Sequence, residues 1–161
     1  HMISAVQKDP ALGYVGKITA VDPTPVLDLL EKGYIPVVST LGCDDAGNVY
    51  NVNADTAAAK LAATLHAESL ISLTDTAGIL RDKDDPSSLI SRVTVAETEQ
   101  LIADGVIAGG MLPKVECCTD AIRGGVRRVF IIDGRVPHSI LIETLTDEGI
   151  GTMFEGEGEH A

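Results

Sequence analysis

A pair of glycines followed four residues later by a lysine is the segment of this chain whose residue types best suit a phosphate group. In Gly109-Gly110-Met111-Leu112-Pro113-Lys114 the glycines let a ligand approach the backbone closely, and Lys114 adds a positive charge where a helix is expected to begin. An ordinary glycine-rich loop before a helix is the alternative interpretation. The chain contains no G-x-x-x-x-G-K-[ST] pattern, which excludes a P-loop enzyme.

Asn51, Asn53 and Asp55 occupy alternate positions, and on an extended backbone this spacing places all three side chains on one face. Two amides and one carboxylate would then point toward a common ligand. Helix capping is the competing explanation, because Asn53 or Asp55 is well suited to begin the alanine-rich helix that follows. Capping accounts for only one of the three residues.

A third polar segment, Thr74 to Gly78, directly follows an apolar run that is expected to form a buried strand, Leu70 to Leu73. In open α/β sheets, ligands bind beyond the carboxyl ends of the strands, where helix N-termini also point. We therefore expect Thr74–Gly78, Asn51–Asp55 and Gly109–Lys114 to lie near bound ligands.

The elements that must position these segments alternate between strand and helix, which is typical of an α/β fold with a largely parallel sheet. The capping box Thr94-Val95-Ala96-Glu97 marks one helix start, and Gly105 marks the end of that helix. The expected strands are 15–21, a buried strand at 35–39, 70–73, 129–132 and an edge strand at 149–154. The other expected helices follow Pro23 and Asp55, begin near Gly109, and span 137–145. The acidic tail 155–161 is expected to be disordered.

Composition narrows the classes of function. The chain has 161 residues, 45% of them apolar, and a formal net charge of −12. Such an acidic surface repels nucleic acid and anionic lipid, so an anionic ligand needs a local concentration of positive charge or free N–H groups. The three cysteines are an odd number, and two of them are adjacent, which fits no disulfide framework or zinc site and indicates a reduced, cytoplasmic protein.

Taken together, these segments resemble the N-acetylglutamate kinase branch of the amino acid kinase family. The similarity extends from about Leu12 to Met153, and the order and spacing of its segments are more specific than any single motif. The matching stretches are Gly13–Gly16, Gly33–Val37, Asn51–Ala58, Leu73–Leu80, Gly109–Val115, Ile131–His138 and Thr146–Thr152.

The resemblance implies a three-layer α/β/α sandwich similar to carbamate kinase. It also implies transfer of the γ-phosphoryl group of ATP, with Mg²⁺, to the side-chain carboxylate of N-acetyl-L-glutamate in arginine biosynthesis. By the same resemblance, Asn51 and Asn53 bind the substrate, Asp55 organises catalytic lysines, and Lys114 contacts the transferring phosphate. The residues expected around the nucleotide are Thr74, Asp75, Gly78, Gly109, Gly110 and Lys114.

Members of this family begin with a Lys-x-Gly-Gly strand, a glycine-rich loop and a substrate-binding arginine, none of which occurs in this sequence. The resemblance therefore implies a chain truncated at its N-terminus. Residues 1–66 would be the remnant of a substrate-binding lobe, and residues 67–161 a nucleotide-binding lobe. Because half of the phosphate site would be missing, we expect this chain alone to be inactive.

Regulation is also implied by the resemblance. The Gly134–His138 and Thr146–Thr152 stretches resemble the branch inhibited by arginine, so His138, Glu148 and Gly151 are candidate arginine-binding residues, although His138 is equally suited to flank its helix. That branch uses an additional N-terminal helix to form a hexamer. The Cys117-Cys118 pair is similar to members that bind a PII-type nitrogen-signalling protein.

Two other hypotheses remain open at the level of sequence. A sibling amino acid kinase would act on glutamate, aspartate, carbamate or uridylate; the Asn51–Asp55 run and the Gly134–His138 segment favour acetylglutamate instead. A protein of a different class would be a non-catalytic module that binds a nucleotide or arginine.

Overall fold

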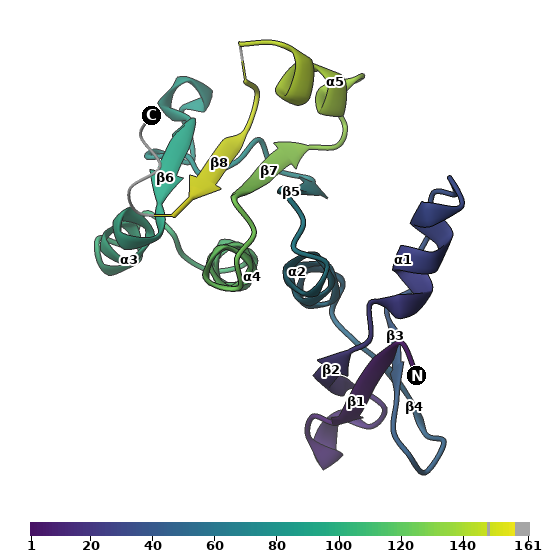
Figure 1. Ribbon diagram of the computed structural model, residues 1–161. Helices are drawn as coiled ribbons and strands as arrows, with labels where there is room; N and C mark the ends of the chain where they lie inside the picture. The colour runs from purple at the N-terminus through teal and green to yellow at the C-terminus, as the bar shows by residue number, and fades with distance from the viewer. Residues whose placement is uncertain (148, 157–161) are drawn as a thin grey trace. The chain divides into compact units, whose positions relative to one another are not determined.

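The computed structural model describes residues 1–147 and 149–156, and the chain divides into two compact units, residues 1–66 and residues 67–161 (Figure 1). Each unit has its own sheet of four strands. No helix in the described part of the chain is long and apolar enough to cross a membrane.

The N-terminal unit is built on a mixed sheet with the strand order β2-β1-β3-β4 (Figure 1). β1 pairs antiparallel with β2 and parallel with β3, and β3 forms an antiparallel hairpin with β4. A turn at Asp44, whose carboxylate accepts hydrogen bonds from the N–H groups of Ala46 and Asn48, closes this hairpin. The strands are β1 (Ile3–Gln7), β2 (Gly16–Val21), β3 (Leu41–Cys43) and β4 (Val49–Asn51), with a 3-10 turn at Pro10–Leu12.

Two helices complete this unit, α1 (Thr24–Glu31) and α2 (Ala54–Thr64). The alanines of α2 allow close packing, and Ala57 joins the small core of the unit. The buried members of that core are Ile3, Ala5, Ile18, Tyr50, Val52 and Ala57.

The buried strand expected at 35–39 is wrong. These residues form no regular element, and the side chains of Ile35 and Val37 are 90% and 95% exposed. A strand needs a neighbour to satisfy its backbone groups, and none of the strands in the described part of the chain pairs with this segment. Apolar composition alone therefore misled the prediction.

The C-terminal unit has the strand order β5-β7-β8-β6. β5 and β7 are parallel, β8 runs antiparallel to β7, and β6 is parallel to β8. The α/β class is confirmed, but both sheets are mixed, so the expected parallel arrangement holds for only some pairs. The strands are β5 (Ser69–Thr74), β6 (Arg92–Thr94), β7 (Arg128–Asp133) and β8 (Thr152–Glu155).

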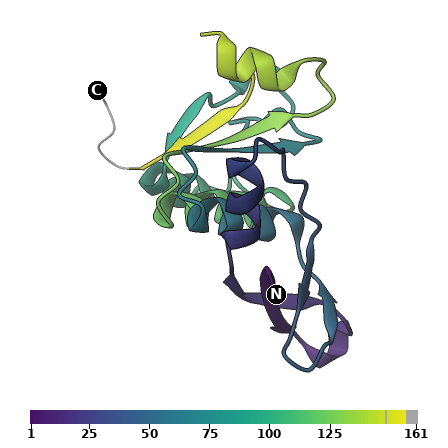
Figure 2. The same ribbon diagram turned by 45° about the vertical axis from the view of Figure 1, so that its right-hand side comes forward.

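Helices α3 and α4 cover one face of this sheet and α5 lies on the other, which gives three layers (Figures 1 and 2). α3 begins with the expected capping box, in which the N–H of Thr94 donates to the Glu97 carboxylate at 2.7 Å and the N–H of Glu97 donates to the Thr94 hydroxyl at 3.2 Å. The core lies where α4 packs on the sheet and contains fully buried Val115, Ile131 and Phe154. The helices are α3 (Val95–Ala103), α4 (Met111–Arg123) and α5 (Ser139–Leu145), with a 3-10 turn at Pro86–Ser88.

Three expectations about the sheet need correction. β8 lies inside the sheet between β7 and β6, whereas β5, expected to be buried, is an edge strand whose Leu73 is 52% exposed. Glu155, assigned to a disordered tail, belongs to β8 and is buried, and its carboxylate forms an ion pair with Arg92 at 3.1 Å. Residues 157–161 of that expected tail lie outside the described residues.

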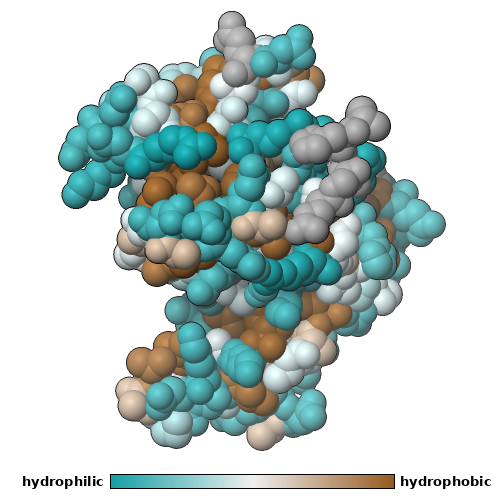
Figure 3. Space-filling model, turned by 90° about the vertical axis from the view of Figure 1, so that its left-hand side faces the viewer, coloured by the Kyte–Doolittle hydropathy of each residue, from teal (hydrophilic) through white to brown (hydrophobic). Residues whose placement is uncertain are grey.

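Figure 3 shows brown apolar side chains among the teal hydrophilic ones, so part of the apolar composition lies at the surface.

Candidate functional site

A pocket of about 820 Å³ lies in the C-terminal unit, between the loop that follows β5 and the loop that connects α3 to α4. This volume is within the range of small-molecule sites. Its lining combines apolar side chains with two cations and one carboxylate. The lining residues are Thr76, Ala77, Gly78, Ile79, Leu80, Arg81, Asp82, Lys83, Gly105, Val106, Ala108 and Met111.

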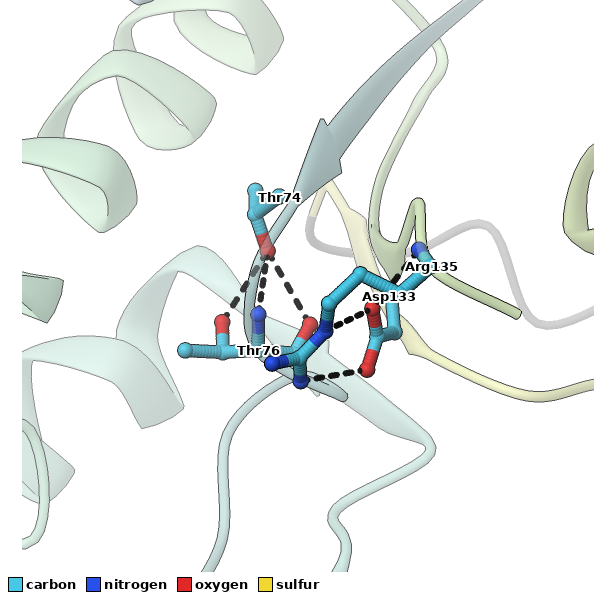
Figure 4. A network of polar contacts seen from close by, with 4 residues as sticks. All are labelled: Thr74, Thr76, Asp133 and Arg135. Atoms are coloured by element: carbon cyan, nitrogen blue, oxygen red, sulfur yellow. Dashed lines mark hydrogen bonds and ion pairs between the residues drawn. The ribbon is translucent and has the colours of Figure 1, made fainter.

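The end of β5 is held in a tight polar turn (Figure 4). The hydroxyl of Thr74 accepts a hydrogen bond from the N–H of Thr76 at 3.1 Å and donates to its carbonyl at 3.0 Å. The two threonine hydroxyls are also 3.0 Å apart. Threonine side chains commonly stabilise turns in this way. The loop that leaves β5 toward the pocket therefore starts from a fixed conformation.

The end of β7 lies beside this turn, and there the side chain of Arg135 forms a bidentate ion pair with the carboxylate of Asp133 (Figure 4). The N–H of Gly134 donates to the carbonyl of Thr74 at 2.9 Å and joins the carboxyl ends of the two parallel strands. The side chain and backbone N–H of Arg135 lower the pKa of Asp133 to about 2. Of the three polar segments expected near ligands, Thr74–Gly78 therefore lies beside the Asp133–Arg135 pair, which was not among the site residues predicted from the sequence.

Of the three nucleotide-binding residues predicted at the end of β5, only Gly78 lines the pocket. Thr74 and Asp75 come before the first lining residue of this loop. Gly78 has a φ of +143°, and a Cβ there would lie 2.5 Å from the hydroxyl oxygen of Thr152. Glycine is therefore required at this position of the pocket lining for steric and conformational reasons.

The predicted phosphate segment at the start of α4 lies at the edge of the pocket, since Ala108 and Met111 on either side of Gly109 and Gly110 line it. Gly109 has a φ of +56°, and Gly110 is the N-cap. Lys114 lies one turn into the helix and is half-buried.

Two backbone donors at this helix start already have partners. The N–H groups of Met111 and Leu112 donate to the carbonyls of Ala108 and Gly109, both at 3.2 Å. A phosphate that used these N–H groups would have to compete with both turn bonds, so the positive charge of Lys114 is the stronger attraction here.

The Asn51–Asp55 segment belongs to the N-terminal unit, where helix capping explains Asn53. Its side-chain oxygen accepts hydrogen bonds from the N–H and hydroxyl of Thr56 at 2.9 and 3.1 Å. Asn51 and Asn53 are exposed on either side of buried Val52, as the alternation predicts. Asp55 departs from that alternation, because α2 begins at Ala54 and the backbone there is helical.

The candidate arginine residues have different surroundings. His138 is exposed in a left-handed conformation, φ +62°, and precedes α5 without a side-chain capping bond. Gly151 is buried, and a Cβ there would overlap the Ile131 carbonyl of β7, so close packing explains why this residue is glycine. Glu148 lies outside the described residues.

Sequence reasoning missed several residues that line the pocket. Arg81 and Lys83 were not among the residues expected around the nucleotide, although two nearby cations are a signal for an anionic ligand. The apolar residues Ile79 and Leu80 gave no such signal, since their position beside the pocket depends on how the two loops fold together.

Comparison with known proteins identifies the class to which this fold and pocket belong. The model of the amino acid kinase family matches residues 1–133, and this chain belongs to that family.

The more specific similarity is to acetylglutamate kinases. The chain is 55% identical over 152 residues to the acetylglutamate kinase of Brachyspira hyodysenteriae, covering 94% of this chain and 53% of that protein. It is 55% identical over 148 residues to the acetylglutamate kinase of Thermosynechococcus vestitus, covering 92% of this chain and 50% of that protein. The chain thus spans about half the length of the curated relatives it matches.

Among solved structures, the fold is similar to N-acetylglutamate synthase from Neisseria gonorrhoeae complexed with coenzyme A and L-arginine. The TM-score is 0.84 at 30% identity, and the match covers 96% of this chain and 36% of that one.

Proposed function

We propose that the whole protein is an N-acetylglutamate kinase of arginine biosynthesis. The 55% identity to an acetylglutamate kinase across 94% of the chain carries this proposal. In the reaction, a carboxylate oxygen of N-acetyl-L-glutamate attacks the γ-phosphorus of ATP, the bond to the β-phosphate oxygen breaks, and ADP leaves. The carboxylate needs no general base, so catalysis depends on alignment and neutralisation of charge.

The nucleotide is proposed to bind in the pocket of the C-terminal unit, which would make residues 67–161 the nucleotide-binding lobe. The apolar side chains of Ile79, Val106 and Met111 suit the base, and Arg81 and Lys83 supply positive charge for phosphates in an otherwise acidic protein. Lys114 is proposed to neutralise charge that develops on the transferring phosphoryl group.

Magnesium is proposed to arrive with the phosphates of ATP. Across residues 1–147 and 149–156, no three His, Cys, Asp or Glu side chains gather closely enough to hold a metal ion. Mg²⁺ in phosphoryl-transfer sites is bound largely by the substrate phosphates and water, with one or two carboxylates, so this side-chain arrangement fits that mode. When bound, the ion would neutralise negative charge on the phosphates.

The acylated amino acid is proposed to bind at the N-terminal unit, residues 1–66, as part of a substrate-binding lobe. Asn51 and Asn53 present exposed amides there. The capping bonds of Asn53 use its oxygen, and its side-chain NH₂ group is the donor proposed for the substrate. Asp55, in the first turn of α2, is proposed to position catalytic lysines.

Arginine is proposed as a feedback inhibitor that contacts His138, Glu148 and Gly151; the similarity to a synthase solved with L-arginine supports it. We also propose that the protein is a homo-oligomer in the cytoplasm and that it binds a PII-type signalling protein, as the Cys117-Cys118 pair suits. These parts rest on the resemblance of the sequence segments.

A trapping assay tests the proposed function. The whole protein is incubated with ATP, Mg²⁺, hydroxylamine and one acceptor at a time, because hydroxylamine converts an acyl phosphate into a hydroxamate, which gives a coloured complex when iron(III) is added. We expect hydroxamate with N-acetyl-L-glutamate and none with glutamate or aspartate. Hydroxamate formed faster with glutamate or aspartate, or ADP released only with carbamate or uridylate, would identify a sibling kinase. Nucleotide binding without transfer to any acceptor would identify a non-catalytic module.

A further inference from the structure

The hydroxyl group of Thr152 links the loop at Ile79 to the loop at Ile90 in the C-terminal unit. Thr152 itself is not among the residues that line the pocket. The oxygen accepts a hydrogen bond from the N–H of Ile79 at 2.8 Å, and the hydroxyl donates to the carbonyl of Ile90 at 2.7 Å. The N–H of Ile90 in turn donates to the carbonyl of Ile79 at 2.8 Å. These three bonds form a closed ring, and the side chain of Thr152 is fully buried.

This ring fixes part of the pocket lining. Gly78, Ile79 and Leu80 line the pocket, and Ile79 has its N–H and its carbonyl in the ring. Gly78 approaches the same threonine so closely that a Cβ would lie 3.0 Å from the backbone nitrogen of Thr152. The 78–80 loop therefore rests directly on the first residue of β8.

A hydrophobic residue in place of Thr152 would disrupt both sides of the ring. Valine has nearly the shape of threonine but no hydroxyl, so the N–H of Ile79 and the carbonyl of Ile90 would each lose a buried partner. Buried backbone groups without partners are strongly unfavourable, and the 78–80 loop would move to find new ones.

We propose that Thr152 is a positioning residue for the pocket: its hydroxyl holds the 78–80 loop in the conformation that binds the nucleotide. This inference rests on the proposed function, since it takes the pocket to be the nucleotide site. It assigns to β8 a role in nucleotide affinity, although β8 contributes no residue to the pocket lining in the described part of the chain.

The test measures ATP binding to this chain by calorimetry, together with melting curves on the same samples. We expect Thr152→Val to weaken ATP binding by about tenfold or more, a loss of about 1.4 kcal/mol. Thr152→Ser, which keeps the hydroxyl, should restore most of the affinity. Thr98→Val is the matched control: Thr98 is also buried, but its hydroxyl bonds the Val95 carbonyl within α3. It should lower the melting temperature and leave ATP affinity within about twofold.

The outcomes separate the two proposals. If the unmodified chain binds ATP and Thr152→Val binds it equally well, the positioning role is wrong while the nucleotide site stands. If the unmodified chain binds no ATP, the nucleotide assignment fails, and the positioning role fails with it. If Thr152→Val is unfolded at the assay temperature, Gly78→Ala decides, because its Cβ would displace the same contact. Unchanged ATP affinity in Gly78→Ala would overturn the inference.

Discussion

The guanidinium of Arg135 binds the carboxylate of Asp133 through two hydrogen bonds. Nε donates to Oδ1 at 2.9 Å, and Nη2 donates to Oδ2 at 2.8 Å. The backbone N–H of Arg135 adds a third bond, to Oδ1, at 2.9 Å. Gly134 between them bonds the carbonyl of Thr74. The ion pair therefore stabilises the turn after β7, and Gly134 in this turn is hydrogen-bonded to the end of β5.

This arrangement predicts a pH-dependent stability. The pKa of Asp133 is lowered from 3.8 to about 2 by its bonds to Arg135, so the carboxylate stabilises the fold above about pH 3.8. That stabilisation is lost as the pH falls from there through about 2. We expect Asp133→Asn to melt below the unmodified chain at pH 6, and the gap to narrow between pH 4 and pH 2.

Melting curves recorded from pH 6 to pH 2 measure this gap. Arg135→Gln removes the other partner, so it should show the same narrowing. A gap that is constant across the whole range for both variants would contradict the role assigned to the ion pair.

Lys114 is predicted to act on the chemical step. In the whole protein, we expect Lys114→Ala to lower turnover by about 10²-fold or more and to change nucleotide affinity less, because a charge aimed at the transition state contributes mainly there. Initial rates at saturating ATP measure the effect. Lys17→Ala, at an exposed position on β2, is the control and should leave turnover unchanged. Normal turnover with a lowered melting temperature would make Lys114 a structural residue.

Substitution of Asn53 is predicted to lower the stability of the protein, and substitution of Asp55 is predicted to lower its activity. Because Asn53 caps α2, Asn53→Ala should lower stability by about 1 kcal/mol. Asp55→Asn should keep the melting temperature within a few degrees, since the change is nearly isosteric, and should lower turnover of the whole protein by about two orders of magnitude.

Melting curves and initial rates on the same preparations compare the two variants. Asn53→Asp is a useful third variant, because aspartate caps about as well as asparagine but has no NH₂ group for the substrate. A near-normal rate in Asp55→Asn would remove this residue from the catalytic proposal.

The 161-residue chain by itself is predicted to bind ATP and to show no transfer to N-acetyl-L-glutamate. The pocket proposed for the nucleotide lies within one unit of the chain, whereas the Lys-x-Gly-Gly strand and the glycine-rich loop expected for the family are not in its sequence. Loss of one preorganised donor lowers rates by about 10²–10³, and several are absent together. Hydroxamate formation at a rate near that of a full-length acetylglutamate kinase would contradict this prediction.

The structural features best predicted from the sequence are those that depend only on residues close together in the chain. The capping box of Thr94 and Glu97 and the helix end at Gly105 need only a few residues of context, and both are present. Strand pairing depends on the whole chain, so the same apolar character gave an incorrect buried strand at 35–39 and an incorrect edge position for β8. The two cations Arg81 and Lys83 could have signalled an anionic ligand, but that they line a pocket depends on how the loop after β5 folds beside the loop between α3 and α4.

The exposure of Ile35 and Val37 also bears on how the protein behaves in concentrated solution. Extended apolar segments at a surface promote association between molecules, whereas the formal net charge of −12 keeps copies apart. Salt shortens the range of that repulsion to about 8 Å at physiological ionic strength and about 3 Å at 1 M, and it leaves the apolar attraction in place. The solubility of this chain should therefore decrease as salt is added. Light scattering across a salt series would follow this decrease, and Val37→Lys should delay its onset.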